Sequence, residues 1–155
     1  MQAPAANRRA GHKLPRGLAV LAALGLVATV LNTPGEPLPM QTVTSETDIR
    51  LSPQQAWEKL SDLSLAHNYV PGIIRTEITT DAVQGEGASR RVYQSKSRYI
   101  NETVTEWRQG QGFTIRLHKD NGNAPAPFAA AEFSYDLAEI DARDTRLHMD
   151  LRCRM

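Results

Sequence analysis

The chain has 155 residues, a formal net charge of +1, one cysteine and 41% hydrophobic residues. Its length fits a single domain, and the near-neutral charge argues against a general nucleic-acid binder. The single cysteine, Cys153, rules out an intramolecular disulfide and a cysteine-based zinc site. The four histidines show no metal-ligand spacing, so the sequence predicts neither a metal nor another cofactor.

The amino-terminal residues predict export or membrane anchoring. Five basic side chains precede an uncharged run rich in Leu, Ala and Val at residues 17–31, namely Arg8, Arg9, His12, Lys13 and Arg16. As a helix this run spans about 22 Å, short of the roughly 30 Å of a bilayer core. Such a run is typical of a secretory signal peptide or a marginal signal anchor, with a buried helix of the domain as the alternative.

The charges before the run also predict the location of the domain. Because they precede the apolar residues, the positive-inside rule places the rest of the chain outside the cytoplasm. We expect a periplasmic or secreted domain, either released or anchored to the inner membrane through residues 17–31. Residues 1–31 are then the basic flank and leader, residues 32–42 a proline-rich extended spacer, and residues 43–155 the domain.

Residues 52–55, Ser-Pro-Gln-Gln, predict the start of a helix. Serine is a favourable N-cap, proline suits the first helical position, and Gln55 completes a capping box. Trp57 belongs to an apolar stripe that must face a sheet, so we expect it in the core. Asp62 begins a break with a second cap, which predicts a second short helix at residues 65–69.

The remainder of the chain has the period-two alternation of β-strands. One strand precedes the helix and six come after it, at residues 43–51, 73–80, 89–95, 99–107, 113–118, 128–140 and 147–154. The glycines at 85 and 87 indicate a turn and not a phosphate-binding loop, because Arg90 replaces a third glycine and a strand comes next. The fold class is α+β, with one antiparallel sheet and a short helical pair after the first strand.

Four segments in this order carry a family resemblance: residues 51–62 (LSPQQAWEKLSD), 69–73 (YVPGI), 85–90 (GEGASR) and 102–107 (ETVTEW). They resemble the SRPBCC superfamily of START-like, helix-grip proteins, which includes the polyketide cyclase/dehydrase and lipid-transport group. The resemblance implies a curved seven-stranded sheet that grips a long carboxy-terminal helix. An apolar cavity for lipids, sterols or polyketides is implied between them.

The sequence departs from this family at its end. It stops within the last predicted strand, at Met155, so the long helix that covers the cavity is missing. Either the chain is a truncated or frame-shifted product, or a partner supplies the cover, such as a second copy in a homodimer. An uncovered apolar face also predicts poor solubility of the isolated domain.

The candidate ligand-binding residues are those near the family motifs or able to line its cavity: Trp57, His67, Tyr69, Arg90, Tyr93, Tyr99, Trp107, Phe113 and Phe128. Glu102 and Glu106, with Arg90 and Arg91, either point into the cavity with shifted pKa values or pair across the outer face of the sheet, which we favour. His118 and His148 alternate with apolar residues and are expected on that outer face.

The resemblance favours binding or transport of a hydrophobic small molecule or lipid, with no nucleic-acid partner. The alternative is a cyclase- or dehydratase-like enzyme that uses Glu102, Glu106 or His67 as its acid or base. No catalytic triad or other catalytic constellation can be recognised from spacing.

Overall fold

The computed structural model describes residues 38–155. The predicted basic flank and apolar run at residues 1–31 lie outside the described residues, as does the spacer up to residue 37. Within residues 38–155, no helix has both the length and the hydropathy that a bilayer span requires.

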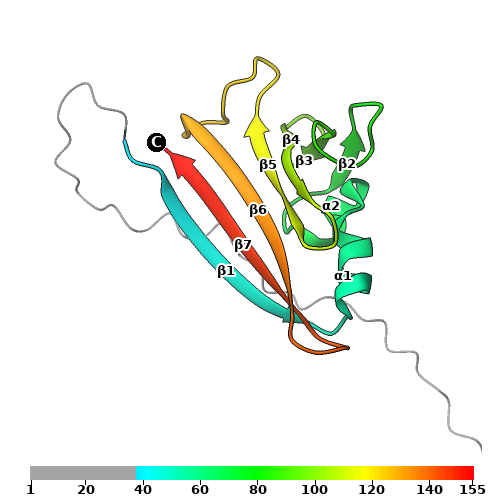
Figure 1. Cartoon of the computed structure of the whole chain (residues 1–155). Helices are drawn as coiled ribbons and strands as arrows, with labels where there is room; N and C mark the ends of the chain where they lie inside the picture. The colour runs from blue at the N-terminus through cyan, green and yellow to red at the C-terminus, as the bar shows by residue number, and fades with distance from the viewer. Residues whose placement is uncertain (1–37) are drawn as a thin grey trace, which may run out of the picture.

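Seven antiparallel strands form one curved sheet, as predicted (Figure 1). Their bounds are β1 (Gln41–Ile49), β2 (Arg75–Ile78), β3 (Ser89–Tyr93), β4 (Tyr99–Arg108), β5 (Gly112–His118), β6 (Ala130–Glu139) and β7 (Thr145–Arg154). The order across the sheet is β1-β7-β6-β5-β4-β3-β2. The helical segment between β1 and β2 packs on one side of this sheet, which we call the inner face; the opposite side is the outer face.

Every strand differs from its predicted range at one end or both, by at most two residues. β1 begins two residues earlier, because its pairing with β7 continues as far as Gln41 opposite Cys153. β2 is shorter than predicted, since ladder pairing with β3 extends only from Arg75 to Ile78.

The first helix, α1 (Pro53–Leu60), begins where the sequence predicts. The Ser52 hydroxyl accepts a hydrogen bond from the Gln55 amide, and the Gln55 side chain accepts one from the Ser52 amide, both at 3.3 Å. This reciprocal pair confirms the predicted capping box. The buried stripe of the helix consists of Ala56, Trp57 and Leu60.

A 3₁₀ turn, η1 (Leu63–Leu65), and a short helix, α2 (Ala66–Tyr69), come after α1. The Asp62 carboxylate accepts hydrogen bonds from the Ser64 amide at 3.1 Å and the Ser64 hydroxyl at 2.6 Å. The predicted break and second cap are therefore confirmed. They turn the chain so that both short elements lie over the start of β2.

Apolar side chains from α1, η1 and the central strands form the core on the inner face. The buried members are Trp57, Leu60, Leu63, Ala88, Val104, Phe113, Ile115, Tyr135 and Met149. Along each strand these residues alternate with polar ones on the outer face, as a pleated strand requires.

A β-bulge in β4 interrupts this alternation. The register between β4 and β5 shifts between Val104 and Glu106. In an unbroken strand the two residues would share a face, but the extra residue Thr105 reverses the alternation. Val104 is therefore buried in the inner core, whereas Glu106 is exposed on the outer face.

The glycines at the start of β3 have the role that the sequence predicts. Gly85 and Gly87 have φ angles of 89° and 84°, which residues with a Cβ rarely adopt. The next element is a strand and not a helix, so the segment is a turn.

No helix of the described residues lies across the inner face after β7, which ends at Arg154. Several apolar side chains there remain half-buried, and we call this area the open inner face: Val43, Phe133, Leu137, Leu147 and Leu151. A curved sheet of this order without the carboxy-terminal helix agrees with the predicted fold class.

Candidate functional site

A continuous line of aromatic rings crosses the inner face. Neighbouring ring centroids are 4.7–5.6 Å apart along the line, within the range of favourable aromatic contacts. In spatial order the rings are Phe133, Tyr135, Phe113, Trp107 and Trp57. Tyr69 reaches Tyr135 from α2, with centroids 6.2 Å apart. Four predicted ligand-binding residues, Trp57, Tyr69, Trp107 and Phe113, are thus brought together.

These rings differ in how accessible they are. Trp57 and Phe113 are 8% and 0% exposed, so they belong to the packed core, as predicted for Trp57. Trp107 and Phe133 are only partly buried against that core. A molecule on the open inner face would therefore contact Trp107 and Phe133 first.

A buried ion pair lies beside the aromatic line. Arg90 on β3 is 1% exposed, and its Nε donates to Glu102 Oε2 on β4 at 2.6 Å. Its Nη1 donates to the Leu63 carbonyl at 3.0 Å and to the Tyr69 hydroxyl at 3.2 Å. Its Nη2 is also buried but has no hydrogen-bond partner among the described residues. This donor is therefore without an acceptor of good hydrogen-bond geometry, although the Tyr135 hydroxyl lies near the guanidinium.

The surroundings of this cluster keep Arg90 charged and Tyr135 neutral. Burial lowers the pKa of Arg90, but the Glu102 carboxylate and the phenols of Tyr69 and Tyr135 raise it, and the net pKa lies above its ordinary value. Burial also raises the pKa of Tyr135 well above 10. Near neutral pH the cluster therefore contains a guanidinium and an un-ionised Tyr135.

The prediction that these charges pair across the outer face is wrong for Arg90 and Glu102. They do lie opposite each other in the β3–β4 register, but on the inner face. The reason is that η1 and α2 supply buried partners, the Leu63 carbonyl and the Tyr69 hydroxyl, which offset the cost of burial.

The other two charges lie on the outer face as predicted, but neither pairs with an opposite charge on a neighbouring strand of the described sheet. Arg91 donates to Asn101 Oδ1 at 3.1 Å on the outer face. Glu106 reaches the same face because of the bulge, and pairs there with Arg108 at 2.6 Å, which lowers the pKa of Glu106.

Two predicted ligand-binding residues, Tyr93 and Tyr99, lie on the outer face and do not join the aromatic line. The Tyr93 hydroxyl donates to Glu77 at 2.8 Å, and the Tyr99 hydroxyl donates to Asp120 at 2.6 Å. The cause is strand alternation, since Arg90 points inward and Tyr93 is three residues along the same strand.

The last two predicted residues lie away from the ion pair. His67 is exposed on α2, with Nδ1 3.1 Å from the Thr76 hydroxyl. Phe128 is half-buried in the loop before β6, and its amide donates to the Pro125 carbonyl. Neither makes a hydrogen bond to the Arg90–Glu102 pair.

The histidines expected on the outer face are found there. His118 Nε2 lies 2.9 Å from the Thr103 hydroxyl. His148 Nδ1 lies 2.9 Å from Glu46, and its Nε2 lies 3.3 Å from Asp150. Within residues 38–155, no group of His, Cys, Asp and Glu side chains is arranged to hold a metal ion.

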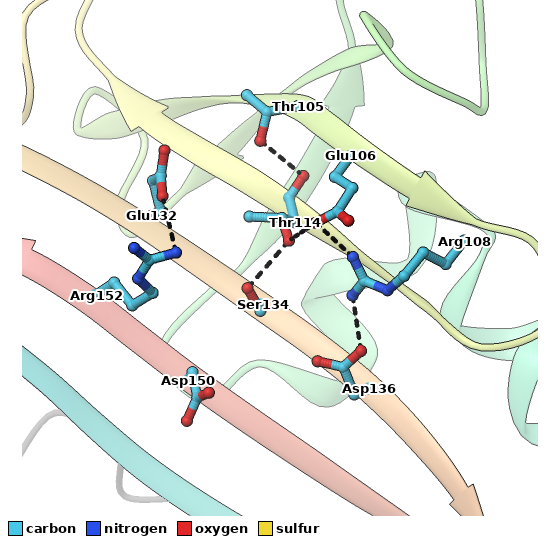
Figure 2. A pocket seen from close by; sticks show the side chains of 9 residues that line it. All are labelled: Thr105, Glu106, Arg108, Thr114, Glu132, Ser134, Asp136, Asp150 and Arg152. Atoms are coloured by element: carbon cyan, nitrogen blue, oxygen red, sulfur yellow. Dashed lines mark hydrogen bonds and ion pairs between the residues drawn. The ribbon is translucent and has the colours of Figure 1, made fainter.

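The outer face has an open polar hollow of about 570 Å³. Figure 2 shows its lining: Thr105, Glu106, Arg108, Thr114, Glu132, Ser134, Asp136, Asp150 and Arg152. Arg108 pairs with both Glu106 and Asp136, and Arg152 lies 3.9 Å from Glu132. These groups satisfy one another, as cross-strand pairs on a solvated face do, so the inner cluster is the better candidate site.

The structure also joins Glu102 and Tyr135 to the cluster. The sequence indicates Glu102 as a possible cavity charge and Tyr135 as an aromatic residue able to line or fill a pocket, but neither is among the nine candidate ligand-binding residues. The alternation of Phe133, Tyr135 and Leu137 places all three on one face, so this pattern could have identified Tyr135. The Leu63 carbonyl has no comparable sequence signal, because a main-chain acceptor is available at every residue.

A family model described as polyketide cyclase / dehydrase and lipid transport matches residues 40–155. No curated protein matches the sequence. The match covers the whole described domain and confirms the family resemblance.

Solved structures share the fold at low sequence identity. The aromatase/cyclase Zhui from Streptomyces sp. R1128 is 15% identical, with a TM-score of 0.60 over 76% of this chain and 70% of its own. Norcoclaurine synthase from Thalictrum flavum is 11% identical, with a TM-score of 0.61 over 77% and 72%. A START superfamily protein from Mycobacterium smegmatis is 16% identical, with a TM-score of 0.57 over 72% and 75%.

Proposed function

Because the chain belongs to the polyketide cyclase/dehydrase and lipid-transport family, we propose that it binds or transports a hydrophobic small molecule or lipid on its inner face. The START-like fold is a ligand-binding fold, and its structural neighbours include both enzymes and binding proteins. The half-buried Trp107 and Phe133 and the open inner face provide apolar contact area for such a molecule.

The Arg90 donor that lacks such an acceptor, Nη2, is the observation that carries this proposal. A buried polar group without a partner costs roughly 1–3 kcal/mol, and more when the group is charged. Proteins keep few such groups, and those they keep call for a partner. A ligand oxygen that accepts from Arg90 Nη2 supplies one.

The charges around this donor favour a neutral oxygen on the ligand. Glu102 already compensates the charge of Arg90 at 2.6 Å. A carboxylate ligand would add an uncompensated negative charge in a buried place, which is costly. A carbonyl or hydroxyl oxygen adds an acceptor without a charge, so the proposed ligand is apolar with one neutral oxygen.

Three probes with the same ring system test this proposal. We expect 2-acetylnaphthalene to bind about tenfold more tightly than 2-ethylnaphthalene, since a hydrogen bond to a charged group contributes about 1.5–3 kcal/mol. The charged 2-naphthoate should bind more weakly than the ketone. Binding is measured by titration calorimetry or by the fluorescence of the two tryptophans, Trp57 and Trp107.

Matched variants distinguish the contribution of the hydrogen bond from Arg90 to the ligand oxygen, which we call the oxygen anchor, from the contribution of the apolar surface. In Arg90→Met/Glu102→Leu the preference for the ketone should disappear while affinity for 2-ethylnaphthalene persists. Arg91→Met, on the outer face, should leave all three affinities unchanged. Equal binding of ketone and hydrocarbon to the unaltered chain would refute the oxygen anchor, and no binding of either would refute the function.

We also propose that this domain lies outside the cytoplasm, either released or anchored by residues 17–31. The support is the sequence order of basic flank and apolar run. Protease added to intact spheroplasts should cleave an anchored domain, whereas a cytoplasmic control protein stays intact. Full protection of the domain would contradict the proposal.

A cyclase- or dehydratase-like activity is the second candidate. The same cluster favours it, because Glu102 could act as an acid or base while the Arg90 guanidinium and the Tyr69 hydroxyl act as hydrogen-bond donors to a reacting oxygen. A naphthyl β-hydroxy ketone that loses water becomes a conjugated enone, which absorbance detects. Enone formation that is lost in Glu102→Gln would support catalysis, and a rate equal to the protein-free rate would count against it.

A further inference from the structure

The two ends of the sheet carry opposite charge. We define the basic rim as the β3–β4 hairpin at 94–98, the β5–β6 loop at 119–129, and the strand ends Met40 and Arg154–Met155. It holds four cationic side chains against one acidic one: Lys96, Arg98, Lys119 and Arg154 against Asp120.

The acidic rim is the opposite end, made of residues 50–52, 79–88, 109–111 and 140–144. It holds four acidic side chains against two cationic ones: Asp81, Glu86, Asp141 and Asp144 against Arg50 and Arg143. Both rims have exposed apolar residues, Met40 and Met155 on the basic rim and Val83 and Ile140 on the acidic one. Charge therefore distinguishes the ends.

The parts of the basic rim are joined to one another. Asp120 accepts from the Tyr99 hydroxyl at 2.6 Å and from Asn101 at 2.9 Å, which ties the β5–β6 loop to the start of β4. The Ala129 amide donates to the Arg154 carbonyl at 2.7 Å, which ties the same loop to the end of β7. The rim is therefore one surface.

The cations of this rim outnumber its one acid, Asp120, which is itself exposed. Lys96 and Lys119 are exposed, and neither side chain makes an ion pair with another described residue. Asp120 is engaged by Tyr99 and Asn101, and these hydrogen bonds lower the pKa of its carboxyl. The rim thus presents net positive charge to solvent.

The chain enters the domain at this same rim. β1 begins at Gln41, next to the end of β7 (Figure 1). Nine residues, 32–40, separate Gln41 from the uncharged run that ends at Leu31. Their greatest extension is about 30 Å. A membrane that holds the run would therefore lie within about 30 Å of the point where the chain enters the basic rim.

We propose that the basic rim docks on a membrane surface rich in anionic phospholipid. Cationic side chains close to such a surface are attracted to it, and acidic ones are repelled, so the charge difference sets the orientation of the domain. The open inner face then lies edge-on to the lipid. This docking does not depend on whether the inner face binds a ligand.

The test uses the full chain and vesicles of phosphatidylglycerol with phosphatidylcholine, compared with phosphatidylcholine alone. Lys96→Gln/Lys119→Gln should lower the affinity for the anionic vesicles by roughly 25-fold, at about fivefold for each cation. Arg50→Gln/Arg143→Gln removes the same charge from the acidic rim and should change the affinity by less than about twofold. The amino-terminal basic flank is present in both variants, so its contribution cancels.

A second measurement reports orientation directly. A fluorophore on Ser97→Cys or on Ala142→Cys, each in a Cys153→Ala chain, marks the basic or the acidic rim. Lipids with a nitroxide headgroup should quench the label at 97 and not the one at 142. Equal quenching of the labels at 97 and 142 would overturn the proposal, and so would equal losses of vesicle affinity in the two charge variants. Binding of the protein to DNA as tightly as to the anionic vesicles would also overturn it. Loss of ketone binding would leave it intact.

Discussion

Replacing Glu102 by Gln tests the energetics of the buried ion pair most directly. The change keeps the shape of the side chain but leaves the Arg90 guanidinium, 1% exposed, without its counter-charge. Removing one partner of a buried pair costs about 3–5 kcal/mol. For a domain of this size that cost lowers the melting temperature by roughly 12–20 °C, at about 4 °C per kcal/mol.

The double variant Arg90→Met/Glu102→Leu is the informative comparison. It removes both charges and fills the space with apolar atoms, so the remaining cost is the unpaired Leu63 carbonyl, about 1–3 kcal/mol. Circular dichroism at 222 nm, a standard probe of helix content, tracks unfolding of each variant. A double variant that is less stable than Glu102→Gln would refute the reasoning. It would mean that a core without either charge costs more free energy than a core with one unpaired charge.

Three further predictions concern the fold. In Gly112→Ala, the new Cβ would overlap the Tyr135 carbonyl oxygen, so we expect a loss of more than about 2 kcal/mol in urea unfolding. Ser52→Ala removes the N-cap of α1 and should cost about 1 kcal/mol by the same assay, whereas Ser52→Gly should cost less. Glu46 raises the pKa of His148 above its ordinary value of 6.5. The stability that protonated His148 contributes through Glu46 is therefore fully present below pH 6.5 and is lost as the pH rises through the raised pKa. His148→Gln should accordingly lower the melting temperature more in acid than in base.

Much of the secondary structure could be predicted from local chemistry. The Ser52 cap, the Trp57 stripe and the Asp62 break place the helices correctly, because capping and periodicity depend on residues a few positions apart. The seven strands result from alternation. The predicted leader at residues 1–31 lies outside the described residues and stays a prediction.

The faces of the strands were harder to predict. Glu102 and Glu106 are four residues apart, so simple alternation puts them on one face, but the bulge at Thr105 separates them. Arg90 was expected on the outer face because charged side chains on adjacent antiparallel strands usually pair there. Its burial depends on Leu63 and Tyr69, whose positions result from tertiary packing and not from the sequence near Arg90.

The pairing of β1 with β7 has a consequence for how a nascent chain matures. Gln41 and Cys153 are direct partners although more than a hundred residues separate them along the backbone. Closing so long a loop is entropically expensive, and the ribosome releases β7 last. The hairpins from β2 to β6 join neighbours and form early, so the first strand waits without a partner until β7 has been synthesised. During that interval it is the segment that a chaperone or a secretion factor would most need to shield.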